Sequence, residues 1–406
     1  MPDVTPLSDH TPPDFTDLTA RSTHLHAWLE TAALPFWWEK GAASGGGFFE
    51  RLGQDGEPVF GDDRRARVQP RQVYCYAMSG AAGWNGPWPA AVEEGLSWFD
   101  ATYRLEDGLY GSLANAEGVL IDPSFDLYNQ AFALFAAAAV ATAEPSRAAE
   151  RELYALGILD RLKQVYAHPE AGFHEAMPPK EPLCSNPHMH LFEAAMAWED
   201  VPNSSVRWAA LVDEIADLAL TRFIDGETGA LREFFDLNWR PMPGEKGRIV
   251  EPGHQFEWAW LLARWGERRQ NGDALARARR LFDIGEAHGI CADRQVAIMS
   301  LYDDFTVHNA MARLWPQTEW LKAAVRLALL GNAAERERYV ASAHRALDAL
   351  EPFLATPIKG LWWDKWPADA PMIDEPAPAS TFYHIVCAIL EFDWAVKRLE
   401  RLQEAG

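Results

Sequence analysis

The sequence has few cysteines and a shortage of basic residues, and each shortage excludes a class of protein. The four cysteines, Cys75, Cys184, Cys291 and Cys387, stand far apart and form no CxxC pair. This spacing is typical of reduced thiols, so we expect a cytoplasmic protein. Lysine and arginine number 37 against 59 acidic residues, a net charge of −22. Such a surface repels nucleic-acid phosphates and anionic lipid headgroups, so we expect neither as a partner.

Long apolar runs are also lacking. The longest, residues 131–143, is too short and too rich in alanine to cross a bilayer. The first residues of the chain are polar and proline-rich, with neither the basic nor the apolar stretch of a signal peptide. We therefore expect no membrane span, and an extended or disordered tail at residues 1–15. Tryptophan, by contrast, is abundant at 18 residues, and hydrophobic residues make up 48%, enough for a large core.

Hydrophobic periodicity and capping residues predict twelve helices and little strand structure. Short links such as residues 85–87 and 144–145 alternate with long ones such as 105–124 and 225–253. The predicted helices are 16–38, 69–84, 88–104, 125–143, 146–168, 187–200, 203–224, 254–270, 273–289, 308–331, 333–354 and 380–403.

This alternation predicts an all-α fold, a closed ring of six helical hairpins known as an (α/α)6 barrel. Residues 16–406 would form one catalytic domain, with short β segments in the long loops at the active-site end. Charge on one face of 146–168 suits an outer helix, whereas 127–143 is apolar nearly all round and suits an inner one. An open α-solenoid is the structural alternative. Because sites are built from loops on rigid scaffolds, we expect the site where the long loops meet.

Polar side chains gather where the predicted inner helices begin. Burying polar groups without partners costs free energy, so we expect these side chains of the inner helices to line a water-filled cavity. His190, His254 and His384 stand at equivalent places on separate helices, which indicates acid–base chemistry. His254 lies in a first turn, where the helix dipole favours a neutral ring, and Glu257, one turn on, would orient it. His190 and Glu193 repeat that spacing.

Other interpretations stay open on the residues alone. His188 and His190 point to opposite sides of a helix and no HExxH motif occurs, so we expect no metal. A glycosidase would need two carboxylates across a cleft, for which Glu193, Glu257 and Glu319 are available. A non-catalytic sugar-binding protein has no need of three aligned imidazoles. Two further groups invite either a binding or a structural role: the tryptophans Trp362, Trp363 and Trp366, and the basic loop residues Arg232, Arg240, Lys246 and Arg248.

Five motifs, in order along the chain, resemble the N-acylglucosamine 2-epimerase superfamily. They are Arg71-Gln72, Asn186-Pro-His-Met-His190-Leu-Phe-Glu193, Glu251-Pro-Gly-His254-Gln-Phe-Glu257-Trp258, Trp315-Pro-Gln-Thr-Glu319 and Ser380-Thr-Phe-Tyr-His384. The last motif is most similar to the branch of mannose and sulfoquinovose isomerases. The resemblance implies an (α/α)6 barrel that interconverts D-mannose and D-fructose, or a close analogue, through a cis-enediol, with no metal or other cofactor.

The resemblance also implies roles for individual residues. His384 would move the proton, His254 would open the sugar ring, and Arg71 would stabilise the enediolate. Glu257 would hold His254. The remaining matched positions would bind the sugar or shape its pocket: His190, Asn186, Tyr128, Met189, Trp315, Ser380 and Glu193. Gln130 stands where some relatives carry histidine, so its role is open.

Within the superfamily the histidines alone do not choose the reaction. A sugar 2-epimerase returns the proton to the opposite face of C2, and a phosphomannose or sulfoquinovose isomerase acts on a sugar with a charged C6. The hydroxyl of Ser380, one turn before His384, favours an isomerase because it would hold an open-chain sugar with C1 and C2 facing one base. We expect a monosaccharide as the partner, and either a monomer or a homo-oligomer such as a dimer.

Overall fold

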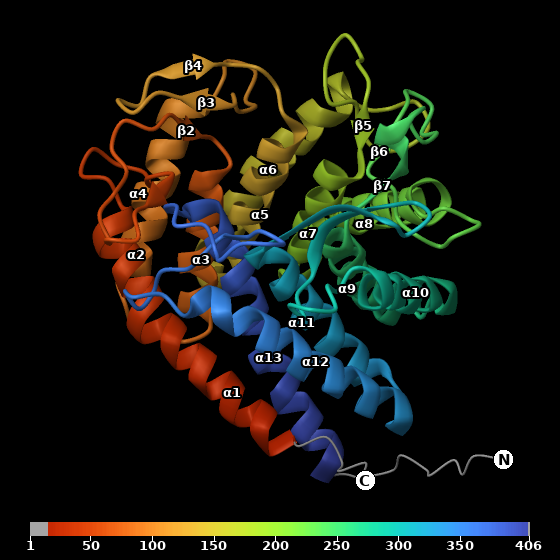
Figure 1. Cartoon of the computed structure of the whole chain (residues 1–406). Helices are drawn as coiled ribbons and strands as arrows, with labels where there is room; N and C mark the ends of the chain where they lie inside the picture. Colours follow the sequence, from red (N-terminus) through yellow and green to blue (C-terminus); the bar gives the residue numbers. More distant parts are fainter. Residues whose placement is uncertain (1–14, 405–406) are drawn as a thin grey trace, which may run out of the picture.

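Two concentric rings of helices form the body of the molecule in the computed structural model, which describes residues 15–404 (Figure 1). The inner ring consists of α3 (Val68–Ala81), α5 (Leu127–Ala143), α7 (Ser185–Asp200), α9 (Pro252–Arg269), α11 (Leu314–Leu330) and α13 (Ala379–Glu404). The outer ring consists of α1 (Phe15–Trp28) with α2 (Leu34–Gly41), α4 (Trp88–Tyr103), α6 (Ala148–Val165), α8 (Val206–Leu218), α10 (Gly272–His288) and α12 (Ala333–Leu354).

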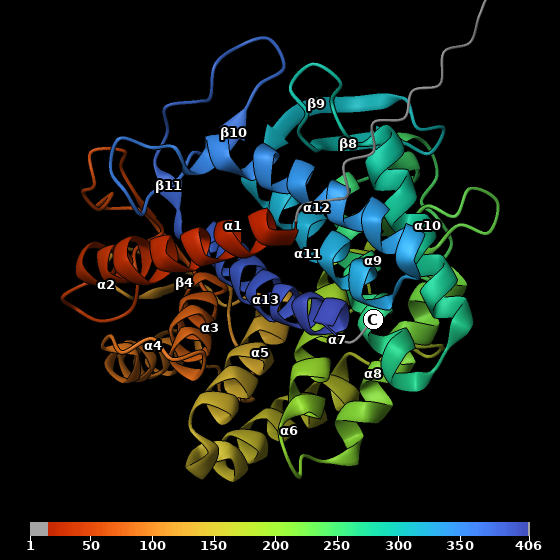
Figure 2. The same cartoon turned by 90° about the horizontal axis from the view of Figure 1, so that it is seen from below.

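The inner ring is closed. Each inner helix contacts the next, and α13 packs against both α11 and α3 (Figure 2). Nearly every residue of α5 is buried, and its many alanines let neighbouring helices approach closely. Outer helices bury one stripe only, as α10 does with Ala274, Ala278 and Leu281. The (α/α)6 barrel is thereby confirmed, and the open solenoid is excluded.

Several predicted boundaries need correction. The predicted helix 16–38 consists of α1, a π-helical turn at Leu29–Ala33 and α2, and the predicted helix 203–224 ends in a second π-helical turn at Ala219–Phe223. The start of the predicted helix 308–331 is wrong, because residues 307–313 form strand β9 and α11 begins only at Leu314. The predicted tail 1–15 lies outside the described residues, apart from Phe15 at the start of α1.

Short antiparallel strands link the long loops at one end of the barrel, the upper end in Figure 1. β1 (Arg51–Leu52) pairs with β11 (Ala377–Pro378), and so joins the first and last long loops. The other sheets are β2 (Arg64–Arg65), β3 (Leu113–Ala114) and β4 (Leu120–Asp122); β5 (Leu183–Cys184) and β6 (Phe234–Phe235); and β7 (Ile249–Val250), β8 (Ile298–Tyr302), β9 (Val307–Arg313) and β10 (Lys365–Trp366).

One side-chain contact repeats around this end and explains the repeated turns of the long loops. A glutamine in the first turn of an inner helix accepts from the backbone N–H of one loop residue and donates to the same residue's C=O. For Gln130 the partner is Tyr110, at 3.0 and 2.9 Å. The same pair of bonds joins Gln69 to Phe48, Gln255 to Leu231 and Gln317 to Ala297. We call these contacts glutamine staples; Gln130 therefore has a structural role.

The tryptophan cluster and the basic loop also belong largely to the framework. Trp362 is fully buried and stacks on Trp37, with ring centroids 4.5 Å apart. In the basic loop, Arg232 and Arg248 both form ion pairs with Asp303, at 2.7 and 2.8 Å. These two arginines are committed to carboxylates, which explains their charge without a bound anion. Among the described residues, no helix combines the length and apolar character that crossing a membrane requires.

Candidate active site

A cavity of about 310 Å³ opens where the inner helices begin and the long loops meet. Inner helices on all sides contribute to its lining, as the closed ring dictates. Nine of the predicted site residues line it: Arg71, Tyr128, Asn186, His190, His254, Glu257, Trp315, Ser380 and His384. Arg65, Arg67, Glu251, Met299, Arg313 and Thr381 complete the wall.

Two predicted site residues do not line this cavity. Met189 is fully buried in the hydrophobic core, because the residue before His190 on α7 faces away from the barrel axis. Its predicted role in shaping the pocket is wrong. Glu193 lies one turn deeper on α7 than His190 and contacts that histidine from below, so it supports the cavity without lining it.

His384 is held by a carboxylate that sequence reasoning had not paired with it. Its Nδ1 donates to Glu319 Oε1 at 2.8 Å, so the neutral ring keeps a bare Nε2 as its basic atom. Burial, together with the positive charges of Arg71 and Lys322, lowers the pKa of His384 well below its usual value. A neutral, oriented imidazole is what a general base requires.

His254 has the opposite protonation preference. Although burial lowers its pKa, the carboxylates of Glu233 and Glu251 raise it more strongly, to about 10. Nδ1 donates to Glu233 Oε2 at 2.9 Å, and Glu251 Oε2 lies 3.5 Å away. The predicted neutral ring is therefore wrong, because two carboxylates outweigh the helix dipole. The predicted partner is also wrong: Glu233, not Glu257, holds His254.

His190 resembles His384 in its setting. Its Nδ1 lies 3.3 Å from Glu193 Oε2, which confirms the predicted pairing, and Tyr383 donates to the same oxygen. Burial lowers the pKa of His190 to about 4, despite that hydrogen bond. Its ring lies edge-on to Tyr128, with centroids 4.8 Å apart. The neutral ring thus presents Nε2 as an acceptor for a hydroxyl.

Glu257 occupies the middle of the barrel. Both of its carboxyl oxygens are buried without a hydrogen-bond partner among the described residues. Burial and the nearby charge of Glu319 raise its pKa well above the usual value. These surroundings favour the protonated carboxyl group, which lines the cavity and is available to donate a hydrogen bond.

Arg71 is the fixed cation of the cavity. Its guanidinium donates to the Ser380 carbonyl at 2.9 Å and to the Tyr128 hydroxyl. It also packs over Phe132, 4.2 Å from the ring centroid. These contacts hold the charge in place before any ligand arrives, and beside it the Asn186 side-chain oxygen is buried without a partner in the described part of the chain.

Two overlapping groups of side chains have the donor atoms of a metal site. They are His190, Glu193 and Glu257, and Glu257, Glu319 and His384, with donor atoms within 4.8 Å of one another in each group. Glu319, however, already has a cation, because Lys322 Nζ lies 2.7 Å from its Oε2. A divalent ion at the second group would face that ammonium, so Lys322 opposes a metal there.

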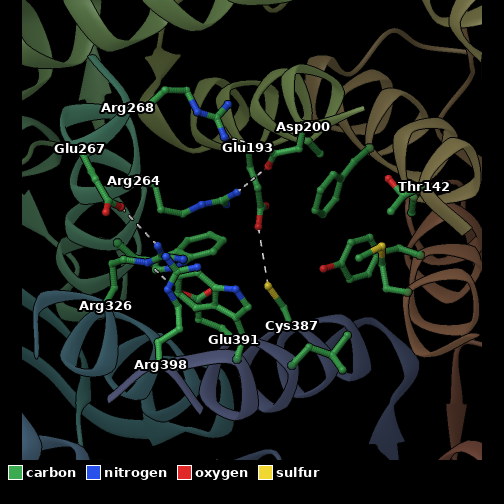
Figure 3. Close-up of a pocket in the computed structure, with 18 residues that line it drawn as sticks. Thr142, Glu193, Asp200, Arg264, Glu267, Arg268, Arg326, Cys387, Glu391 and Arg398 are labelled. Atoms are coloured by element: carbon green, nitrogen blue, oxygen red, sulfur yellow. Dashed lines mark hydrogen bonds and ion pairs between the residues drawn. The ribbon is translucent and has the colours of Figure 1, made fainter. Parts of the chain in front are cut away.

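A second and larger cavity, of about 620 Å³, lies at the opposite end of the inner ring (Figure 3). Glu193 and Cys387 form part of its wall, so Glu193 separates this cavity from His190. Three of its arginines form ion pairs: Arg264 with Asp200 at 3.1 Å, Arg326 with Glu391 at 2.6 Å and Arg268 with Glu199 at 2.8 Å. Arg268 lies in the last turn of α9, where it also offsets the negative end of that helix.

Sequence reasoning missed Glu233 and Lys322. Glu233 stands in a long loop just before β6, where no periodicity marks it. Lys322 lies one turn after Glu319 on α11, and a buried lysine beside a glutamate is a detectable signal on an otherwise apolar helix. Neither residue is in the quoted motifs.

The family model for N-acylglucosamine 2-epimerase (GlcNAc 2-epimerase) matches residues 47–388, from the first long loop into α13. The chain belongs to the N-acylglucosamine 2-epimerase family. This confirms the predicted resemblance over almost the whole barrel, including every residue of the cavity wall named above.

Relatives and structural neighbours of this chain are named as sugar isomerases and epimerases. A relative from Rhizobium meliloti (strain 1021), named mannose-6-phosphate isomerase, is 59% identical over 389 residues, covering 94% of this chain and 99% of that protein. A crystal structure of D-mannose isomerase superposes with a TM-score of 0.82 at 19% identity, covering 94% of this chain and 99% of that one. Cellobiose 2-epimerase from Bacillus thermoamylovorans gives 0.81 at 16% identity, with 93% and 99% covered. The chain is therefore an enzyme of a family of sugar isomerases and epimerases.

Proposed function

We propose that the protein is an aldose–ketose isomerase that interconverts D-mannose and D-fructose, or a close analogue, by histidine acid–base catalysis. One observation carries this proposal. Two histidines whose pKa values are shifted in opposite directions both contact Trp315 in the cavity: the pKa of His384 is lowered by burial and nearby cations, whereas that of His254 is raised by carboxylates despite burial. Ring opening needs an acid, and proton transfer between neighbouring carbons needs a base.

In the proposed reaction, His384 Nε2 removes the C2 proton of the open-chain aldose. The C–H electron pair forms the C1–C2 double bond of a cis-enediol while O1 gains a proton from the His254 imidazolium. O2 then gives its proton back to His254 as the O2 carbonyl forms, and His384 returns the carried proton to C1. The hydrogen bond from Nδ1 to Glu319 keeps Nε2 as the basic atom through both steps.

His254 and Arg71 would act on oxygen atoms. The His254 imidazolium donates a proton to the ring oxygen, and the O1 hydroxyl proton passes to His254 as the C1 carbonyl forms, which opens the pyranose and restores the imidazolium. Arg71, fixed by Ser380 and Tyr128, stabilises negative charge on O1 and O2 as the enediolate develops. His190 and Asn186 would bind hydroxyl groups. These assignments leave each histidine in the protonation state that its surroundings favour.

The same asymmetry favours an isomerase over a 2-epimerase. Inversion at C2 requires a second proton-transfer group on the opposite face of the sugar. His254 lies between Glu233 and Glu251, whose carboxylates favour the protonated ring, so it cannot accept the C2 proton until it has given up its own. His190 is neutral and is the alternative second base, so product analysis has to distinguish the two reactions.

A phosphorylated substrate is the second candidate. The 59% identical relative is named mannose-6-phosphate isomerase, and Arg65, Arg67 and Arg313 line the cavity. Each of these arginines, however, already pairs with a carboxylate of the protein: Glu50, Asp126 and Asp364, respectively. We therefore favour the neutral hexose, and we expect kcat/KM for mannose to exceed that for mannose 6-phosphate.

The experiment that tests the function is incubation with mannose in D2O, followed by NMR of the products. We expect fructose with solvent deuterium at one C1 position, because an imidazole that carries a proton can exchange it before returning it. Cellobiose and N-acetylmannosamine serve as comparison substrates for the epimerases, and mannose 6-phosphate for the phosphorylated alternative.

Glucose as the main product from mannose, with little ketose, would replace the isomerase by a 2-epimerase. Fructose without any deuterium would contradict proton exchange at His384, and mannose labelled at C2 would then separate a shielded proton shuttle from hydride transfer.

Metal independence is a separate prediction. Because histidines and Arg71 are proposed to carry the chemistry, dialysis against a chelator should leave kcat unchanged within experimental error. Turnover would be measured before dialysis, after it, and after adding back Mg²⁺, Mn²⁺, Co²⁺ or Zn²⁺. Activity that is lost and then restored by one of these ions would place a metal at the groups around Glu257 and overturn the mechanism.

A further inference from the structure

The barrel interior contains a lysine that the proposed reaction does not use. Lys322 and Glu319 stand one turn apart on α11, and both side chains are completely buried. Removing a pair of ions from water costs several kcal/mol, and their attraction offsets that cost only in good geometry. A lysine in such a place needs a reason beyond packing.

The contacts of Lys322 continue directly to the proposed base. Its Nζ lies 2.7 Å from Glu319 Oε2, while the other oxygen of Glu319 accepts from His384 Nδ1 at 2.8 Å. One carboxylate thus bridges an ammonium and an imidazole. The ammonium also sits over the Trp260 ring, 3.8 Å from its centroid, which fixes it from the other side.

The charged groups around Lys322, Glu319 and His384 come from most of the inner helices. Lys322 faces three carboxyl groups of different helices, and Arg71 is a second cation that acts on His384. The titratable and charged groups packed here are Arg71 on α3; His190 and Glu193 on α7; His254 and Glu257 on α9; Glu319 and Lys322 on α11; and Tyr383 and Cys387 on α13.

We propose that Lys322 is a positioning residue of the active site: its ammonium holds the Glu319 carboxylate in place against His384 Nδ1 and thereby keeps Nε2 free as the basic atom. The proposal rests on the proposed function only in naming His384 as the base. Its geometry and its first readout concern the protein without substrate.

The physical argument has two parts. Without the ammonium, Glu319 Oε2 would lose the contact that holds the carboxylate in place, and the hydrogen bond between Glu319 and the His384 ring would loosen. The ammonium also repels a proton on His384 and so favours the neutral ring. Removing the charge of Lys322 should therefore raise the pKa of His384 and lower the population of its Nδ1–H tautomer. A lysine that only joined α11 to its neighbours would do neither.

The test is Lys322→Met, which removes the charge and keeps most of the side-chain volume. NMR of protein labelled with ¹⁵N in its histidines would follow His384 across pH, with its signals assigned from their loss in His384→Ala. We expect the Nδ1–H tautomer to become less populated and the titration of His384 to move up by on the order of one pH unit. The acid limb of the pH profile of kcat should also move to higher pH, so that activity is lost at low pH and recovers as pH rises.

Lys163→Met is the matched control, since Lys163 pairs with Glu214 outside the ring of inner helices. Lys163→Met should change neither the titration of His384 nor the acid limb of the pH profile of kcat. Lys322→Arg keeps the charge and should also keep both, which provides a test even where the methionine variant does not fold.

An unchanged His384 tautomer and titration in Lys322→Met would overturn the proposal and leave Lys322 a purely structural ion. A loss of kcat in Lys322→Met that is equal at all pH values, with the acid limb unmoved, would also overturn it. So would an acid limb that moves in Lys322→Arg, because that variant keeps the charge. If the sugar assays fail because the substrate is misassigned, the NMR titration still decides the role of Lys322.

Discussion

Replacing His384 by alanine should lower kcat for mannose by on the order of a hundredfold or more, the usual contribution of a positioned general base. The variant retains Arg71, His254 and the cavity, so substrate still binds and KM should change much less than kcat. Steady-state kinetics at several pH values, with product measured by NMR, gives both parameters.

The fold should survive this change. His384 lines a cavity rather than filling the core, and Glu319 keeps its ion pair with Lys322 when the ring is gone. Thermal unfolding followed by circular dichroism would check this point. His24→Ala is the matched control, because His24 is exposed on α1 and should lose no activity. A His384→Ala enzyme with nearly full kcat would remove this residue from the mechanism.

Replacing His254 by alanine should also lower kcat by on the order of a hundredfold, because a positioned general acid contributes as much as a base. The loss should depend on which anomer or ring form is supplied, since the proposed role of His254 is to open the pyranose. Rates with freshly dissolved mannose and with open-chain analogues would separate ring opening from proton transfer at carbon.

Glu233→Gln distinguishes the observed partner of His254 from the predicted one. A carboxylate that raises the pKa of His254 keeps the imidazolium present until pH rises through that pKa of about 10. Loss of the Glu233 charge lowers this pKa, so the alkaline limb of kcat should move to lower pH. Glu257→Gln is the matched carboxyl variant and should move that limb less, since Glu257 does not bond to His254. Equal shifts in the two variants would contradict this assignment.

The fold followed from the sequence because its signals are local. Apolar periodicity marks each helix, and alternating link lengths fix which helices share the inner ring. The start of α11 was misplaced because residues 307–313 contain alanine and methionine, good helix formers, although their pairing with β8 places them in a strand. A cross-strand partner outweighed local propensity there.

The site was predictable where its residues lie on helices and not where they lie in loops. His190, His254 and His384 stood out because imidazoles are unusual on buried helices. Glu233 did not stand out, because a loop lacks the periodicity that would show where its carboxylate points. The protonation of His254 therefore could not be predicted either, since it depends on that same carboxylate.

The glutamine staples have a consequence for how this barrel acquires new specificities. Each anchors its long loop at one point next to an inner helix, so the loop segments outside the staples and the paired strands carry less of the framework. Insertions or exchanges there change what the cavity recognises without disturbing how the chain folds. Designers who graft loops between such barrels should therefore keep the stapled residues, the paired strands and Glu233, and vary only the segments outside them.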